Sequence, residues 1–157
     1  MKTTRWKAYL GGILLTEAAG WLVGWLNRAG IQAYQLGVVK PPLTPPAWVF
    51  PVVWAVLYAL MGIGAARVLL ARPSSMRAQA LLVYAAQLVV NLLWVAIFFQ
   101  MQNYGFALFW ITVLWLLIVC MIYTFWMVDR LAAVLQIPYL IWVSFAIYLN
   151  LGVWALN

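Results

Sequence analysis

The sequence contains no histidine, only two acidic residues and a single cysteine among 157 residues. These shortages exclude a serine–histidine–acid triad, an ordinary zinc site, a paired-carboxylate hydrolase and an intramolecular disulfide. The absence of histidine also removes the commonest axial ligand of haem iron. We therefore predict no metal site and no required cofactor, and we expect Cys120 to be a small buried apolar side chain.

Charged residues are also scarce. They make up 7% of the chain, whereas 69% is hydrophobic and 17% is aromatic, which is typical of an integral membrane protein. Five apolar runs, at residues 8–26, 47–70, 78–99, 105–128 and 133–156, each approach the roughly 20 residues that cross hydrocarbon as a helix. Because the runs are continuously apolar rather than alternating, residues 1–157 are predicted to form a single all-α membrane domain of five transmembrane helices.

Lysine and arginine are distributed unevenly between the two ends of the predicted helices. One end receives Lys2, Arg5, Lys7, Arg72, Arg77 and Arg130, with Arg67 one turn inside, whereas the other receives only Arg28 and Lys40. The positive-inside rule then predicts a cytoplasmic amino terminus. The net charge of +7 follows from this topology and from attraction to anionic lipid, and no basic cluster typical of nucleic-acid binding is present.

The amino-terminal stretch has an alternative interpretation. Its basic residues, its apolar run and the small residues Thr16 and Ala18 resemble a secretory signal with a cleavage site. The apolar character continues through Trp21 and Trp25, which favours a retained first helix.

Aromatic residues are abundant, with 11 tryptophans, 8 tyrosines and 7 phenylalanines. Tryptophans near the predicted helix ends are expected at the membrane interface, namely Trp6, Trp25, Trp48, Trp126 and Trp154. Those predicted deep in the bilayer are Trp54, Trp94, Trp115 and Trp142. The deep tryptophans are the more informative, because a buried indole N–H requires a hydrogen-bond partner.

The run over residues 78–99 carries polar and aromatic residues at helical spacing. Tyr84, Gln87, Asn91, Trp94 and Phe98 are separated by three and four positions, which places them on one face. Amides at this depth are costly unless they face protein or a cavity, so the face should point into the bundle. Hydrogen bonds between helices would be a purely structural use of Gln87 and Asn91, and contact with a ligand is the alternative.

Corresponding stripes occur on two other predicted helices. They consist of Trp54, Tyr58 and Met61 in the second helix and of Trp142, Ala146 and Leu149 in the fifth. At about 1.5 Å per residue, the tryptophans of these stripes reach the depth of Asn91, in the outer half of the bilayer. Aromatic walls with a few polar groups are typical of a pocket for a flat apolar ligand.

Glu17 lies within the first predicted span, where a carboxylate must be neutral, paired or hydrated. Gln87 is a candidate partner at a similar depth, and Arg67 is a less favourable one. A structural hydrogen bond is the main interpretation of Glu17, and a role in proton relay or ligand binding is the alternative.

Three blocks of sequence match a known family. They are KPPLTPPAWVFPVVWAVLYALMG at residues 40–62, YAAQLVVNLLWVAIFF at residues 84–99 and PYLIWVSFAIYLN at residues 138–150. In order and spacing they resemble the tryptophan-rich sensory protein family, whose animal members are the translocator protein, or peripheral benzodiazepine receptor. The resemblance covers nearly the whole chain.

The resemblance implies a five-helix bundle, usually a homodimer, in a bacterial cell membrane. Such a protein binds porphyrins, among them protoporphyrin IX, as ligand or substrate beneath the loop that joins the first two helices. Some members are reported to promote light-dependent porphyrin breakdown, and Trp54 and Trp142 match the two tryptophans associated with it. The implied ligand-binding residues are Tyr34, Lys40, Pro45, Trp54, Tyr58, Gln87, Asn91, Trp94, Phe98, Trp142, Phe145, Ala146 and Leu149.

The loop over residues 27–46 is expected to cover this pocket as a lid, because its prolines lack a donor and fix φ. Thr44 is expected to cap the second helix, with Pro45 in its first turn. Lys40 and Arg28 are the cations on this face that are able to meet porphyrin carboxylates. Leu43 and Gln35 depart from the family pattern, in which aromatic residues are usual.

Three functions remain open at this stage. The first is a receptor or sensor that binds porphyrins, with light-dependent degradation as an added activity. The second is a small transporter of tetrapyrroles or apolar compounds, which the lack of evident inverted repeats disfavours. The third is a regulatory membrane scaffold. Small residues on the third predicted helix, namely Ala78, Ala85, Ala86 and Ala96, are a candidate homodimer contact.

Overall fold

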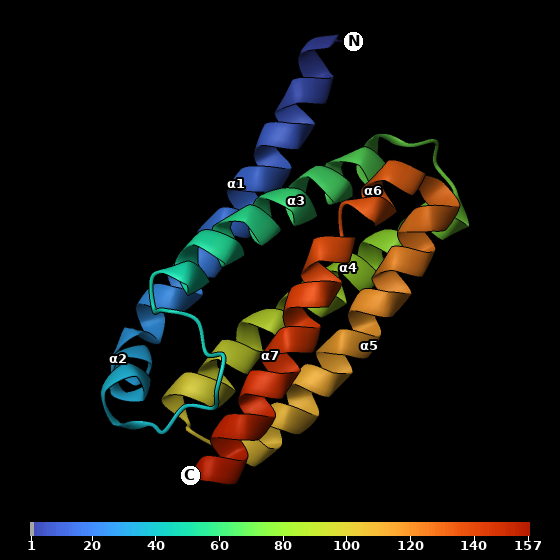
Figure 1. The fold of residues 1–157 in the computed structure, drawn as a ribbon. Coiled ribbons are helices and arrows are strands. Elements are labelled where there is room, and N and C mark those ends of the chain that lie inside the picture. Colours follow the sequence, from blue (N-terminus) through green and yellow to red (C-terminus); the bar gives the residue numbers. More distant parts are fainter. Residues whose placement is uncertain (1) are drawn as a thin grey trace.

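The computed structural model describes residues 2–157, with side chains from Thr4 onward, so the predicted charge of Lys2 lies outside the described side chains. The elements are α1 (Lys2–Leu26), α2 (Arg28–Gly37), α3 (Val49–Leu70), α4 (Ser75–Val95), a π-helical turn η1 (Ala96–Gln100), α5 (Tyr104–Val128), α6 (Arg130–Val134) and α7 (Ile137–Leu156). No strand occurs in this part of the chain. The amino and carboxyl termini lie at opposite ends of the bundle (Figure 1).

The described residues contain five segments long and apolar enough to cross a membrane. They are Thr4–Leu26, Val49–Leu70, Ser75–Gln100, Tyr104–Val128 and Arg130–Leu156. These segments lie close to the five predicted runs. The prediction of an all-α bundle with five transmembrane helices is therefore confirmed.

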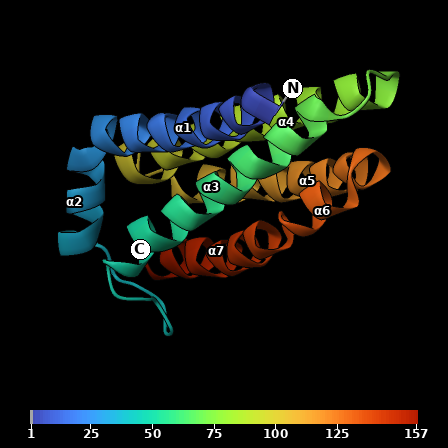
Figure 2. The ribbon, with the colours of Figure 1, turned by 90° about the horizontal axis from the view of Figure 1, so that it is seen from above.

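The bundle consists of two groups of helices. α1 packs along α3, whereas α4 packs against α5, and α5 packs against α7 (Figure 2). Gly12 and Gly62 allow the close approach of α1 and α3, because a Cβ added at Gly62 would lie 2.5 Å from the Gly12 carbonyl oxygen. The Thr16 hydroxyl also donates to the Tyr58 carbonyl at 2.7 Å. Small residues and one buried hydroxyl thus join the first two spans.

The segment between these spans differs from the predicted loop over residues 27–46. Residues Arg28–Gly37 form α2, because the stretch RAGIQAYQLG contains no proline and can continue as helix after a short break. Gly30 allows α2 to lie directly on η1, since a Cβ there would be 2.4 Å from the Phe99 carbonyl oxygen. The non-helical part of the connection is therefore only residues 38–48.

The proline-rich stretch also corrects the predicted start of the second span. α3 begins at Val49, and Trp48 occupies its N-cap without a side-chain bond. The Thr44 hydroxyl instead donates to the Pro41 carbonyl at 2.7 Å, so the prediction that Thr44 caps this helix and that Pro45 starts it is wrong. A residue that precedes proline avoids helical geometry, which keeps Thr44 and Pro45 out of the helix, while Pro42 and Leu43 form a turn in which Leu43 has a φ of 67°.

The outer surface agrees with the expected membrane setting. The five tryptophans predicted for the interface, Trp6, Trp25, Trp48, Trp126 and Trp154, are all exposed on the bundle. Cys120 is exposed as well, so the prediction that it is buried is wrong. The buried face of α5 runs through Ile111, Leu114, Ile118 and Met121, and Cys120 lies off this stripe.

The described basic residues are distributed between the two ends as expected. Arg5 and Lys7 lie at the start of α1, Arg72 lies in the connection between α3 and α4, Arg77 lies at the start of α4, and Arg130 follows α5. We call this the amino-terminal end of the bundle. Arg28 and Lys40 lie at the opposite end, near α2.

Candidate ligand-binding site

A buried hydrogen-bond network links α3, α4 and α7. The Tyr58 hydroxyl donates to Asn91 Oδ1, Asn91 Nδ2 donates to the Tyr139 hydroxyl, and the Tyr139 hydroxyl donates to Gln87 Oε1, each at 2.8 Å. Gln87 Nε2 lies 3.8 Å from the Met61 sulfur. Gln87 and Asn91 therefore face the interior as predicted, and they serve the structural purpose of joining helices.

A layer of aromatic side chains lies beside this network. Phe50 and Trp54 extend from α3, and Trp142 and Phe145 extend from α7; we call these four residues the aromatic layer. The Phe50 and Trp142 rings are 5.9 Å apart at an edge-on angle, and Trp142 is 5.7 Å from Phe145. Since the backbones of α3 and α7 make little direct contact, these rings span the space between the two helices.

The ring of Trp54 connects the aromatic layer to the network. Its centroid lies 5.6 Å from that of Tyr58 and 6.3 Å from that of Tyr139. Both phenols are buried, whereas Trp54 and Trp142 are only half-buried. The two tryptophans thus have one side against the buried core and another accessible from outside the bundle.

The indole N–H groups distinguish these two tryptophans from the other deep ones. Among the described residues, Trp54 and Trp142 have no hydrogen-bond partner for this group. The other interior indoles donate within the bundle: Trp94 to Asn150 Oδ1 at 3.1 Å, Trp110 to the Val90 carbonyl at 2.9 Å, and Trp115 to the Ser144 hydroxyl at 2.9 Å. Trp54 and Trp142 therefore retain a donor that an incoming molecule can use.

Three other predicted ligand-binding residues belong to a separate group. Tyr34, Trp94 and Phe98 pack together with Phe99 and Tyr104 where α2 covers η1; we call this the α2 cluster. Trp94 stacks on Phe98 at 5.0 Å, and Tyr34 lies 5.4 Å from Phe98. Burial raises the pKa of Tyr34 to about 12, so this phenol stays neutral. The structure gives these residues a packing role apart from the aromatic layer.

The remaining predicted residues belong to α7 and to the connection over residues 38–48. Ala146 and Leu149 are buried on α7, and Pro45 is half-buried. The connection rests on the end of α7, because Pro41 packs against Gly152 and the Tyr148 hydroxyl donates to the Pro42 carbonyl at 2.8 Å. Residues 38–48 are therefore held over the carboxyl-terminal part of α7.

Lys40 has local partners in the structure. Its Nζ donates to the carbonyls of Tyr34, Gln35 and Val38 at 3.2, 3.1 and 3.3 Å, and it lies 4.9 Å from the centroid of the Tyr34 ring. A cation at the last carbonyls of a helix offsets the negative end of its dipole. Lys40 therefore caps α2, and an anionic ligand would have to compete with these carbonyls.

Glu17 does not contact either partner expected from the sequence. Gln87 is bonded to Tyr139, and Arg67 is bonded to Asp129, whereas Glu17 has no hydrogen-bond partner among the described residues. Thr16, one position earlier on α1, is the residue that faces α3. Because adjacent helical residues are rotated by about 100°, the expected Glu17 pairings fail while its neighbour makes the contact.

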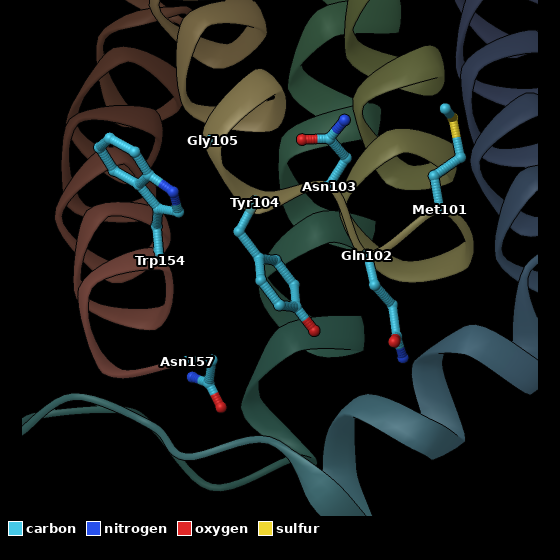
Figure 3. Close-up of a pocket in the computed structure, with 7 residues that line it drawn as sticks. All are labelled: Met101, Gln102, Asn103, Tyr104, Gly105, Trp154 and Asn157. Carbon is cyan, nitrogen blue, oxygen red and sulfur yellow. The ribbon is translucent and has the colours of Figure 1, made fainter.

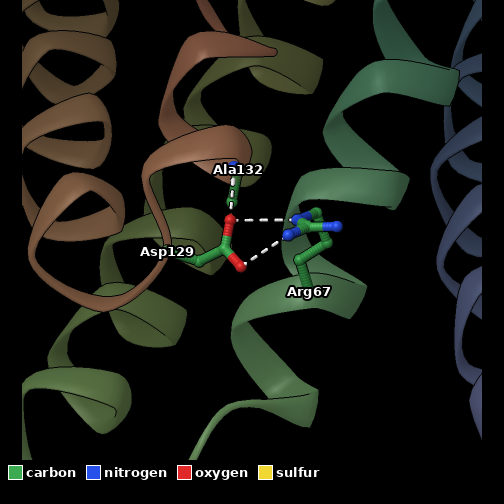
Figure 4. A network of polar contacts seen from close by, with 3 residues as sticks. All are labelled: Arg67, Asp129 and Ala132. Carbon is green, nitrogen blue, oxygen red and sulfur yellow. Dashed lines mark hydrogen bonds and ion pairs between the residues drawn. The ribbon is translucent and has the colours of Figure 1, made fainter.

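Arg67 and Asp129 form an ion pair at the amino-terminal end (Figure 4). Arg67 Nε donates to Asp129 Oδ1 at 2.9 Å, and Arg67 Nη2 donates to Oδ2 at 2.8 Å. Oδ1 also accepts the Ala132 N–H at 2.8 Å, which caps α6. The Arg67 guanidinium holds the pKa of the Asp129 carboxyl below its usual value. The carboxylate is thus ionised at neutral pH.

Two cavities lie outside the aromatic layer. One, of about 480 Å³, is an open depression between the start of α5 and the end of α7, lined by Met101, Gln102, Asn103, Tyr104, Gly105, Trp154 and Asn157 (Figure 3). The other, of about 180 Å³, lies at the amino-terminal end beside Arg67 and Asp129. None of the ligand-binding residues predicted from the sequence lines either cavity.

Two residues of this region were missed by the sequence reasoning. Tyr139 is the centre of the hydrogen-bond network, and Phe50 closes the aromatic layer against Trp142. Both had a usable signal: Tyr139 lies three positions before Trp142, and Phe50 lies four positions before Trp54. Extending the two predicted stripes by one helical turn would have found them.

Comparison with known proteins relates this architecture to a family. The profile of the TspO/MBR family matches residues 12–155. Protein CrtK of Rhodobacter capsulatus is 42% identical over 119 residues, which cover 75% of this chain and 74% of that protein. The tryptophan-rich sensory protein of Cereibacter sphaeroides is 43% identical over 118 residues, with 75% and 73% covered. The human translocator protein is 33% identical over 150 residues, with 93% and 88% covered.

The family profile thus includes at least part of each of the five spans, and the relatives include proteins named as sensors and as translocators. Together with the apolar helices, this match makes the chain an integral membrane protein. The chain belongs to the TspO/MBR family.

Proposed function

We propose that the protein is a membrane receptor for porphyrins and similarly flat apolar molecules, which bind against the aromatic layer. The observation that carries this proposal is the state of Trp54 and Trp142. Both indoles are half-buried, and neither N–H has a partner among the described residues, whereas the other interior indoles donate within the bundle. A flat conjugated molecule stacks on such rings and accepts from their free donors.

The packing of the layer limits where such a ligand lies. The four rings already contact one another and the phenols of Tyr58 and Tyr139, so the ligand takes the accessible side of the indoles. The connection over residues 38–48 is held beside the aromatic layer, because the Tyr148 hydroxyl donates to the Pro42 carbonyl and the Tyr148 ring stacks on Phe145. Carboxylates of a porphyrin would reach Lys40 only by displacing its carbonyl partners on α2.

Light-dependent porphyrin breakdown is the activity that we assign to Trp54 and Trp142. In this step an indole in contact with an excited porphyrin transfers one electron to it, which leaves an indole radical cation and a porphyrin radical anion. Dioxygen is the oxidant that later steps consume. Neither general acid–base residues nor a bound metal is needed for the electron transfer.

The proposal includes the orientation and the assembly of the protein. The basic amino-terminal end faces the cytoplasm by the positive-inside rule. Two copies associate through the third span, where Ala78, Ala85 and Ala86 of α4 are exposed and Ala96 of η1 is half-buried. Small residues on a lipid-facing helix allow the close approach that such an interface requires.

The test is a titration of the purified protein with protoporphyrin IX, with tryptophan quenching followed in the dark and the pigment spectrum followed under light. Trp54→Phe and Trp142→Phe should each slow light-driven pigment loss at least about tenfold while dark binding changes less. Trp94→Phe is the matched control, because the Trp94 indole donates to Asn150.

The outcomes separate the competing functions. Binding in the dark without pigment loss under light would remove the photochemical activity and leave the receptor. An absence of quenching would favour a scaffold. Porphyrin flux into liposomes that contain the protein, above that into empty liposomes, would support the transporter.

A further inference from the structure

The cavity at the amino-terminal end has no role in the function proposed above. It has a volume of about 180 Å³ and is lined by Arg5, Tyr9, Arg67, Leu70, Ala71 and Asp129. Its walls come from α1, from the end of α3 and from the junction of α5 and α6. A water molecule takes about 30 Å³ in the liquid, so the cavity has room for a polyatomic group.

The cavity carries a net positive charge. Two guanidinium groups, Arg5 and Arg67, face a single carboxylate, Asp129. Arg67 uses Nε and Nη2 for Asp129, and its third nitrogen points away from the carboxylate (Figure 4). Arg5 has no hydrogen-bond or ion-pair partner among the described residues. The Arg5 donors therefore remain available for an anion, and the Tyr9 hydroxyl lies within hydrogen-bonding reach of the Arg67 guanidinium, which keeps only part of its donors free.

The arrangement of these donors suits a tetrahedral oxyanion. Guanidinium groups bind phosphate oxygens through paired N–H donors, and the Tyr9 hydroxyl supplies a neutral donor in the same cavity. Asp129 holds the Arg67 guanidinium in a fixed position through two bonds, so this donor is oriented before the anion arrives. The same carboxylate also repels an anion and thereby limits its affinity.

The position of the cavity indicates the source of the anion. Arg67 lies within the span Val49–Leu70, one turn from its end, and the apolar side chains of Leu70 and Ala71 form part of the cavity wall. The cavity thus lies where the apolar part of the bundle meets its charged end. Headgroups of phospholipids occupy this depth in a bilayer.

We propose that this cavity binds the phosphate of an anionic phospholipid in the leaflet at the amino-terminal end of the bundle. Arg5, Tyr9 and Arg67 contact the phosphate oxygens, Asp129 positions Arg67, and the lipid chains run along α1 and α3. Exposed cations nearby, such as Lys7 and Arg130, attract anionic lipid to this end without selecting a site.

The experiment uses the full chain in neutral detergent micelles and measures the shift of the unfolding temperature on addition of phosphatidylglycerol or phosphatidylcholine. A ligand that binds the folded protein raises this temperature by an amount that grows with the logarithm of one plus the ratio of the ligand concentration to Kd, so the concentration dependence of the shift gives an apparent Kd. We expect phosphatidylglycerol to stabilise the protein and phosphatidylcholine to stabilise it at least about tenfold more weakly, as judged by apparent Kd.

Four variants test the assignment. Arg5→Gln should weaken the binding of phosphatidylglycerol about tenfold, as judged by apparent Kd. Tyr9→Phe, which changes no charge, should weaken this binding about threefold. Asp129→Asn should instead strengthen this binding, because the competing charge is removed while the amide oxygen can still accept the Arg67 Nε–H and hold the guanidinium in place. Arg130→Gln is the matched control: it removes a charge at the same end but does not line the cavity, and its effect should stay below about threefold.

The proposal is overturned if Arg5→Gln and Arg130→Gln weaken the binding of phosphatidylglycerol equally while Tyr9→Phe has no effect. Non-specific electrostatic attraction to the basic end of the bundle would then explain the binding. If inorganic phosphate stabilises the protein as well as phosphatidylglycerol does at equal concentration, the claim that the bound phosphate belongs to a phospholipid is rejected. Should Asp129→Asn fail to fold, the variants of Arg5 and Tyr9 still decide, because Arg5 makes no hydrogen bond among the described residues and Tyr9→Phe keeps the ring.

Discussion

The hydrogen-bond network and the aromatic layer adjoin one another through the ring of Trp54, yet they differ in how fully their polar groups are bonded. In the network, Tyr58, Asn91, Tyr139 and Gln87 bond to one another in sequence. In the layer, the indole N–H groups of Trp54 and Trp142 have no partner among the described residues. The first region is complete within the protein, and the second is open to another molecule.

The physical setting explains why the difference matters. Apolar contact between helices gains little in lipid, where the tails are as apolar as leucine, so interhelical hydrogen bonds and close packing hold the bundle together. The network supplies such bonds between α3, α4 and α7. A ligand can therefore occupy the layer without disturbing the contacts that fix these helices.

The largest effect on stability is expected from Asn91→Leu. The change removes the acceptor of the Tyr58 hydroxyl and the donor to Tyr139, which leaves buried polar groups without partners. The free energy of unfolding should fall by about 2–3 kcal/mol. Thermal unfolding in detergent measures it, with Trp142→Phe as the control that should lose less than about 1 kcal/mol. Equal losses would remove the distinction between the two regions.

A smaller loss is expected from Tyr139→Phe. The ring that faces Trp54 is kept, but Gln87 Oε1 loses its donor and Asn91 Nδ2 loses its acceptor. Stability should fall by about 1–2 kcal/mol, whereas dark binding of protoporphyrin IX should change less than about threefold. A large loss of binding with little loss of stability would instead assign Tyr139 to the ligand.

Trp94→Phe sharpens the comparison among the indoles. It removes the bond from Trp94 to Asn150 and should reduce stability by about 1 kcal/mol. Its rate of light-driven porphyrin loss should equal that of the native protein, in contrast to Trp54→Phe. If the two variants lose this activity to the same extent, a free indole donor is not what marks the site.

The smallest effect concerns pH and the ion pair at the amino-terminal end. Arg67 lowers the pKa of Asp129 below its ordinary value of about 3.9. A carboxyl group whose pKa is lower in the folded state than in the unfolded state stabilises the fold. This stabilisation is complete when the pH is above the unfolded-state pKa, and it is lost as the pH falls through the folded-state pKa. The side chains of the pair keep 30% and 23% of their exposure, so the contribution should stay below about 1 kcal/mol.

Unfolding temperatures of the native protein and of Asp129→Asn between pH 6 and pH 3 measure this contribution. The difference between the two should shrink toward the acid end as the native carboxyl begins to protonate. A difference that grows on acidification would contradict the sign of the pKa shift.

Much of the interior could be predicted from helical spacing. The stripe on the third span placed Tyr84, Gln87, Asn91, Trp94 and Phe98 on one face, and all five are buried. This prediction succeeded because an amide that faces lipid is costly. A polar stripe on a membrane helix therefore turns toward the interior of the bundle.

Other features depended on partners that spacing does not reveal. Lys40 caps α2, a helix that replaced part of the expected loop, and Thr16 rather than Glu17 meets α3. Tyr34 and Phe98 were grouped with the ligand site, yet Tyr34 of α2 packs on Phe98 of η1. Each outcome depends on the rotation or the position of one element relative to another, which a single helix pattern leaves undetermined.

The amino-acid sequence by itself determined the five apolar spans, the face of the third span and the unequal charge of the two ends. These follow from local rules: the length that crosses hydrocarbon, the helical period and the cost of a buried charge. Only the tertiary structure decided that Tyr139 joins Asn91 to Gln87, that Arg67 pairs with Asp129, and that the indoles of Trp54 and Trp142 keep their donors. Those outcomes arise where helices distant in sequence meet, because each polar group bonds to whichever partner the packing brings within reach.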